Sequence, residues 1–433
     1  MKIKNYRWII VSMLFFATTI NYMDRQIIGL LKPTLESEFN WTETDFAHIV
    51  MAFTAAYAIG LLLLGRFIDW VGTKTGYSVA VVVWSLAGML HAVAKSVWGF
   101  SFARIGLGIG EAGNFPAAMK AVSEWFPKKE RALATGIFNA GTSVGVVLAL
   151  VLCPYILSAY GWREVFWVTG ALGFVWLALW LFLYDVPSRQ KRLSREELEL
   201  INKGQEYDSD RKEKEISVKW IKLFSFPQTW AVVIGKFMID PIYWFFLFWL
   251  PSYFTAHFQI DLTKPSIPLM IIYAATTIGC VGGGYLSSWF IRRGMATLKA
   301  RRKALLIFAV TELCVIMLQF VSNVWIAVAI LSLAVAVHQG WATNVFTLAS
   351  DMFPKQVVSS VVGIAGMSGA VGGILFPMFV GFLLDYYKNL GNISFGYNII
   401  FTFCGCTYLV VWLIITFLIK RSEKIKIETA IFK

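Results

Sequence analysis

Apolar runs of about twenty residues recur along the whole chain, and they limit the possible folds more than any other feature of the sequence. A run of this length crosses a bilayer as a helix, because lipid offers no partner to backbone N–H and C=O groups. Only 15% of the 433 residues are charged, whereas soluble proteins have about a quarter. The pattern predicts an all-α membrane protein with twelve transmembrane helices, over residues 8–31, 46–64, 77–93, 97–122, 132–155, 165–184, 230–254, 267–290, 304–321, 324–349, 357–384 and 397–419.

The basic residues predict the orientation of these helices. If both termini lie in the cytoplasm, the segments on that side contain 30 of the 39 Lys and Arg residues, the opposite loops contain 5, and 4 lie within spans. Such an excess of Lys and Arg marks cytoplasmic loops, so we expect both termini inside. The net charge of +13 is spread over short loops and forms no basic face, which argues against a nucleic-acid partner.

The chain start and the cysteines indicate neither a cleaved leader nor a metal site. The first apolar run continues into Asn21, Asp24 and Arg25, so it reads as a first span and not as a signal peptide. The five cysteines all fall within apolar runs without metal-type spacing, and we interpret them as reduced packing residues. No metal, cofactor or catalytic residue is predicted.

The two halves of the chain repeat one another. Residues 124–128 (EWFPK) are followed by Gly136 and Gly145, and residues 351–355 (DMFPK) are followed by Gly363 and Gly372 at the same intervals. We therefore predict two pseudo-symmetric six-helix bundles, at 1–184 and 226–420, joined by a cytoplasmic linker at 185–225 and followed by a tail at 421–433. Paired halves of this kind are typical of transporters that rock about a cargo site between them.

A short amphipathic helix is expected in the linker. Residues 194–197 (SREE) form a capping-box pattern, and Leu198, Leu200 and Ile201 follow it. The alternative is a flexible linker, because short isolated helices are only marginally stable.

The loop after the second span contains Gly65, Asp69, Gly72 and Lys74 in the sequence GRFIDWVGTK. The glycines permit a tight turn, and Asp69 can accept hydrogen bonds from backbone N–H groups or pair with a basic residue. This resembles the loop signature of the major facilitator superfamily, and its expected role is gating. The alternative is an ordinary charged turn.

Four ionisable residues stand out within the spans of the first half: Asp24, Arg25, Arg104 and Glu111. Ionisable groups at membrane depth are costly and are therefore candidates for function. A guanidinium suits a carboxylate, so we assign Arg25 and Arg104 to an anionic cargo. Burial favours the protonated form of a carboxyl, so Asp24 and Glu111 can carry protons. Alternatively, fixed ion pairs such as Asp24 with Arg104 only brace the helices.

The second half offers weaker candidates for the same site. Lys236 and Asp240 are spaced to pair on one helix face, with cargo contact as the other option. His338 occupies the repeat position of Glu111 and is either functional or simply hydrogen-bonded. Further polar side chains that could contact cargo hydroxyls or join helices are Tyr22, Tyr57, Asn114, Asn139, Thr142 and Asn344.

These residues resemble the anion:cation symporter family. The resemblance rests on residues 21–25 (NYMDR), the loop at 65–74, and residues 104–116 (RIGLGIGEAGNFP). Residues 124–132, 138–142 and 336–341 resemble bacterial hexuronate transporters more narrowly. The resemblance implies that Asp24 and Glu111 take up protons and that Arg25 and Arg104 engage a cargo carboxylate. Thr142 stands where the aldonate branch has Gln, which favours a hexuronate.

The expected function is proton-coupled uptake of a hexuronate, such as glucuronate or galacturonate, across a bacterial inner membrane by a monomeric protein. The alternatives are a symporter for an aldonate such as galactonate or for a small carboxylate, and a multidrug antiporter. The paired arginines argue against the antiporter. An enzyme or receptor is not indicated, because the sequence has no nucleophile with a base, no metal cluster and no phosphate loop.

Overall fold

The computed structural model describes residues 5–201, 220–353 and 355–419. The predicted tail at 421–433 and part of the linker lie outside these residues. The described chain is helical and falls into two compact units. The N-terminal unit draws on residues 1–41, 48–213 and 262–265, and the C-terminal unit on 42–47, 214–261 and 266–433. The first turn of α2 thus groups with the second unit.

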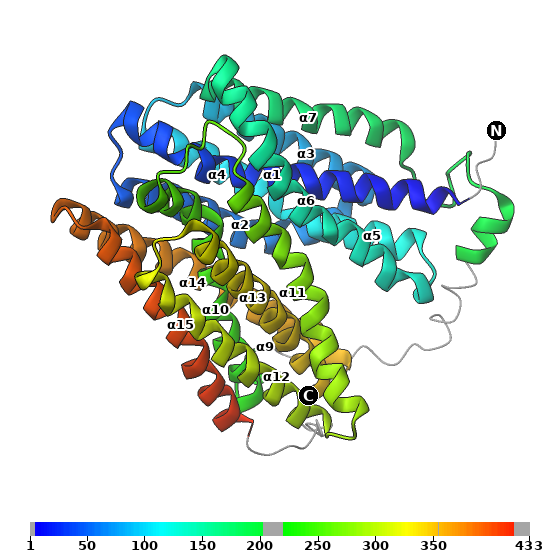
Figure 1. Cartoon of the computed structure of the whole chain (residues 1–433). Coiled ribbons are helices and arrows are strands. Elements are labelled where there is room, and N and C mark those ends of the chain that lie inside the picture. Colours follow the sequence, from blue (N-terminus) through cyan, green and yellow to red (C-terminus); the bar gives the residue numbers. More distant parts are fainter. Residues whose placement is uncertain (1–4, 202–219, 354, 420–433) are drawn as a thin grey trace. The chain divides into compact units, whose positions relative to one another are not determined.

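In the N-terminal unit, α1 packs along α6, and α3 packs against both α4 and α7 (Figure 1). The helices are α1 (Tyr6–Phe39), α2 (Glu43–Val71), α3 (Thr73–Leu90) with the 3₁₀ turn η1 (His91–Val93), α4 (Val97–Ala112), α5 (Asn114–Trp125), α6 (Lys128–Tyr160) and α7 (Trp162–Leu183).

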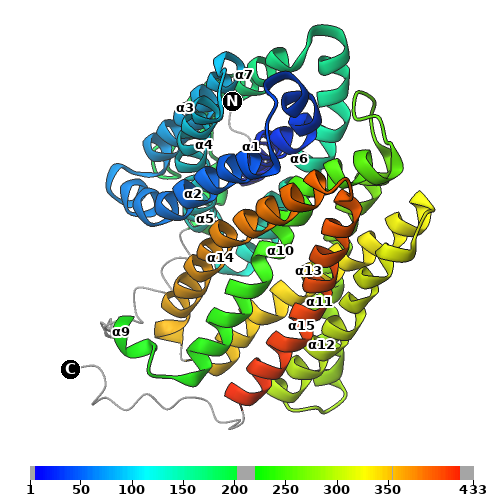
Figure 2. The same ribbon diagram turned by 90° about the vertical axis from the view of Figure 1, so that its left-hand side faces the viewer.

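In the C-terminal unit, α11 packs along α13 and α10 packs along α14 (Figure 2). The helices are α9 (Trp220–Leu223), α10 (Pro227–Phe258), α11 (Ile267–Arg292), α12 (Thr297–Glu312) continued by the 3₁₀ helix η2 (Leu313–Phe320), α13 (Val324–Met352), α14 (Lys355–Asn389) and α15 (Ile393–Leu418).

Within the described residues, ten helices are long and apolar enough to cross a membrane, which confirms the predicted all-helical membrane fold. The other two predicted spans are also helical, but they do not meet that test. Helix α1 carries Asp24, Arg25 and Lys32, and α4 is only 16 residues long. The predicted span 97–122 is interrupted at Gly113, because Pro116 has no N–H with which to continue the helical hydrogen bonds. Twelve crossings and cytoplasmic termini stay predictions.

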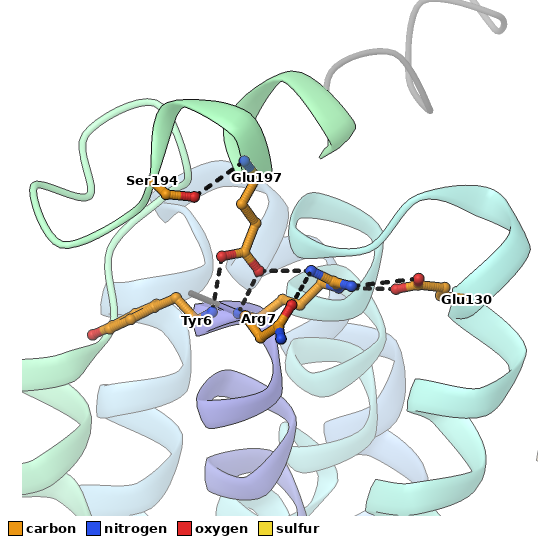
Figure 3. A network of polar contacts seen from close by, with 6 residues as sticks. Tyr6, Arg7, Glu130, Ser194 and Glu197 are labelled. Carbon is orange, nitrogen blue, oxygen red and sulfur yellow. Dashed lines mark hydrogen bonds and ion pairs between the residues drawn. The ribbon is translucent and has the colours of Figure 1, made fainter. Parts of the chain in front are cut away.

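The linker segment contacts the start of α1 (Figure 3). Residues 195–201 are helical, and the Ser194 hydroxyl accepts a hydrogen bond from the backbone N–H of Glu197 at 3.2 Å. The Glu197 carboxylate does not return to Ser194. It accepts from the backbone N–H groups of Tyr6 at 2.9 Å and Arg7 at 3.2 Å, and so caps the N-terminus of α1.

Arg7 completes this contact. Its guanidinium pairs with Glu197 at 2.8 Å and with Glu130, at the start of α6, at 2.9 Å (Figure 3). Burial by itself lowers the pKa of Arg7, but the hydrogen bonds and charges of the two glutamates outweigh burial and raise it. The linker, α1 and α6 are therefore joined by one charged network.

We expect Glu197→Gln to lower the free energy of unfolding by about 1–3 kcal/mol, because a charged cap and a buried ion pair are lost together. Thermal unfolding of the purified protein measures the effect. Glu196→Gln is the matched control, since Glu196 is the exposed neighbour. Equal melting temperatures for the two variants would contradict the assigned role of Glu197.

Candidate functional site

Close helix packing sets the position of α1, which carries Asp24 and Arg25. A Cβ added at Gly145 on α6 would lie 2.2 Å from the carbonyl oxygen of Thr19, so only glycine allows this approach. Helix α4 is held in the same way, because a Cβ at Gly108 would lie 2.6 Å from the Phe53 carbonyl oxygen on α2. These contacts hold α1 against α6 and α4 against α2.

Arg25 and Glu111 form a buried ion pair. The Nη2 and Nε atoms of Arg25 both donate to the Oε2 atom of Glu111, at 2.8 Å and 3.0 Å. The exposed fractions of the two residues are 3% and 1%. The Oε1 atom of Glu111 has no hydrogen-bond partner among the described residues, so it is available to take up a proton.

Arg104 lies in the same interior with a different environment. Its side chain is 1% exposed, yet none of its three guanidinium nitrogens has a hydrogen-bond partner in the part of the chain that the structure describes. The ring of Phe53 lies 5.5 Å from the guanidinium carbon. A buried cation left with an aromatic ring alone is strongly disposed to bind an anion.

Asp24 is 4% exposed and forms no ion pair with a described residue. It lies within electrostatic range of Glu111 and Arg104. The bracing pair considered from the sequence, Asp24 with Arg104, is not the one that forms, since Arg25 pairs with Glu111 instead.

Aromatic rings surround the Arg25 guanidinium. Its carbon lies 4.6 Å from the ring of Tyr22, 5.1 Å from Phe53 and 4.7 Å from Tyr57. Such contacts partly compensate a cation for lost hydration. Phe53 contacts both arginines and was not among the residues predicted from the sequence. Its spacing of four from Tyr57 places both on one face of α2 and could have indicated it.

The polar candidates of the first half divide into two groups. Asn114 is buried, donates to the Thr18 hydroxyl at 3.3 Å and accepts from the Tyr77 hydroxyl, so it joins α5 to α1 and α3. On α6, Asn139 is exposed and Thr142 is half-buried. Asn114 therefore joins helices through satisfied hydrogen bonds, whereas Asn139 and Thr142 are polar residues of α6 that are not fully buried.

The candidate residues of the C-terminal unit form three separate sets of contacts. Lys236 and Asp240 form an ion pair at 2.7 Å, as their spacing predicted. His338 is buried, its Nδ1 atom is 2.6 Å from the Tyr408 hydroxyl, and its ring stacks on Tyr243. The Asn344 amide donates to two backbone carbonyls, those of Gly283 and Gly340, and so joins α11 to α13.

The loop motif takes a tighter form than expected. Helix α2 continues to Val71 and α3 begins at Thr73, so Gly72, with φ of +86°, is the whole connection. Only glycine adopts this conformation readily. Lys74 lies 3.6 Å from Asp185, and a side chain at Gly65 would meet open space. The Asp69 side chain lies outside the described set, so its predicted role is unchanged.

The chain matches the Major Facilitator Superfamily model over residues 14–377 and 299–430. It is 32% identical to the hexuronate transporter of Escherichia coli K12 over 386 residues, 89% of each chain. It is 33% identical to the galacturonate transporter of Dickeya chrysanthemi over 302 residues, 70% of this chain and 87% of that one. The crystal structure of a D-xylose–proton symporter superposes with a TM-score of 0.73 at 15% identity, covering 98% and 99% of the two chains.

The helical fold and these matches define a polytopic membrane transporter. The chain belongs to the major facilitator superfamily, and the predicted resemblance to bacterial hexuronate transporters is confirmed.

We expect Gly145→Ala to reduce the yield of folded protein severely, because its methyl group would overlap the Thr19 carbonyl and push α1 away from α6. Size-exclusion chromatography of the purified protein measures the yield. Gly136→Ala, on the same helix with nothing within 4 Å of the added atom, is the control. Similar yields for both variants would contradict the packing argument.

Proposed function

We propose that the protein imports a hexuronate, such as glucuronate or galacturonate, together with protons by alternating access. The buried, unpartnered guanidinium of Arg104 is the observation that carries the proposal. A guanidinium stays charged at any physiological pH, and it binds a carboxylate with two parallel hydrogen bonds. The substrate therefore supplies the negative charge that the described protein atoms do not place on Arg104.

Glu111 supplies the coupling. In its charged form it occupies two of the Arg25 donors. A proton taken up by Glu111 removes the charge that holds Arg25, and the guanidinium is then able to join Arg104 on the substrate carboxylate. Substrate binding and proton binding thus favour one another. Asp24, buried nearby without an ion pair to a described residue, is the second proton carrier.

A proton is also required by the energetics of uptake. A monoanion that enters a cell with a negative interior works against about 2.3 kcal/mol per 100 mV. One accompanying proton cancels that charge, and a second makes the membrane potential favour uptake. Two buried acids beside two arginines are suited to this task.

A hexuronate is favoured over other organic anions by the names of the two similar relatives and by the threonine at position 142. Tyr22, Tyr57 and Thr142 are the proposed contacts for sugar hydroxyls. In this proposal the protein works as a monomer in the bacterial inner membrane, with twelve crossings and both termini in the cytoplasm, and the loop at 65–74 acts in gating.

We expect Arg104→Ala to weaken glucuronate binding roughly ten- to a hundredfold, the loss that follows when a charged hydrogen-bond partner is removed. Calorimetry on the purified protein measures the affinity. Arg163→Ala is the control, because Arg163 is exposed and pairs with Glu38 away from the site. Unchanged affinity in Arg104→Ala would remove this residue from the substrate site.

We expect Glu111→Gln to abolish accumulation of glucuronate driven by a pH gradient while exchange across the membrane continues, because glutamine imitates the protonated acid and cannot release a proton. Uptake and counterflow in proteoliposomes measure the two activities. Glu164→Gln, which neutralises an exposed acid at the start of α7, is the control. If gradient-driven accumulation survives in Glu111→Gln, Glu111 is not the coupling acid.

A further inference from the structure

The C-terminal unit contains an acid that the proposed mechanism does not use. Glu312 is 0% exposed, and neither of its carboxylate oxygens has a hydrogen-bond partner among the described residues. An ionised carboxylate in such surroundings is far less stable than the protonated acid. The geometry therefore favours a bound proton on Glu312.

The position of Glu312 in its helix is also unusual. It is the last residue of α12, and the chain continues as the eight-residue 3₁₀ helix η2. Runs of 3₁₀ helix longer than four residues are uncommon, and within a longer helix they often mark a functional hinge. Glu312 thus lies at the junction between the α-helix α12 and the 3₁₀ helix η2.

The groups that face Glu312 carry no positive charge. They are Cys314 on η2, and Cys404 and Tyr408 on α15. Helix α15 approaches closely, because a Cβ at Gly405 would lie 3.4 Å from the Glu312 carbonyl oxygen. Among the described residues, no cation has a resolved electrostatic effect on Glu312.

Tyr408 on α15 lies within electrostatic range of Glu312. Its hydroxyl lies 2.6 Å from Nδ1 of His338 on α13. Tyr408 is also within electrostatic range of Asp240, and His338 of Lys236, both on α10. The Tyr408–His338 contact therefore lies within electrostatic range of both Glu312 and the Lys236–Asp240 pair.

We propose that Glu312 is a proton-binding site of the transport cycle, separate from Asp24 and Glu111. The site takes up one proton, forming an O–H bond on the carboxylate, and gives up that proton when the substrate has crossed. The role in the cycle depends on the proton-coupled uptake proposed above, whereas the bound proton does not.

Two measurements on the full-length protein test this. Infrared difference spectroscopy of the detergent-purified protein follows the carbonyl stretch of protonated carboxyls during a pH titration, and we expect Glu312→Gln to remove one such band. In proteoliposomes, the proton-to-glucuronate ratio of Glu312→Gln should fall by a single proton while glucuronate affinity is kept. An unchanged set of bands, or an unchanged ratio, would overturn the proposal.

Tyr408→Phe provides a second test if Glu312→Gln does not fold. We expect it to shift the pH profile of glucuronate uptake, because the hydroxyl that contacts His338 and lies within electrostatic range of Glu312 is removed while the ring is kept. Tyr273→Phe is the matched control, since the buried Tyr273 hydroxyl donates to the backbone carbonyls of Phe246 and Leu247 on α10. Identical pH profiles for the two variants would refute a role for the Tyr408 hydroxyl beside Glu312. If wild-type protein takes up no glucuronate, the proposed function fails, and the infrared titration still decides whether Glu312 holds a proton.

Discussion

Two guanidinium groups held away from water are the central constraint on this protein. Arginine cannot discharge itself by losing a proton, so the N-terminal unit must accommodate Arg25 and Arg104 as cations at every pH. It does so unequally. Arg25 receives a carboxylate and three aromatic rings, whereas Arg104 receives one ring and the distant charges of Asp24 and Glu111. In the proposed mechanism, the arginine that is paired with Glu111 is released by protonation, and the arginine without a hydrogen-bond partner receives the anion.

The glycine contacts explain how such an arrangement is held in place. Helices in lipid gain nothing from burying apolar surface against one another, and they associate through close backbone approach. Gly145 and Gly108 permit that approach at the helices that carry the charges. At the cytoplasmic end predicted from the sequence, Glu197 and Arg7 add a polar contact that lipid could not replace. The charged site therefore rests on small residues in the interior and on an ion-pair network at the helix ends.

Much of the fold could be predicted from the sequence, because an apolar run of sufficient length has only one stable conformation in lipid. The functional candidates followed from the rule that an ionisable residue within a membrane span is energetically costly and is therefore a candidate for function. That rule does not say which acid meets which arginine, since the pairing of Arg25 with Glu111 depends on how three helices pack. Phe53 was missed because an apolar residue gives no such signal. Glu312 did give one, lying as a carboxyl within a predicted span, and it should have been singled out.

The single residue that joins α2 to α3 has a mechanical consequence. Gly72 leaves no slack between the two helices, and the next backbone contact, from the Gly76 N–H to the Gly72 carbonyl, already belongs to the following turn. A tilt of α2 is consequently transmitted to α3 without being absorbed by an intervening loop. Phe53 and Tyr57, which contact the arginines, lie on α2, so a tilt of α2 would move these rings and α3 together.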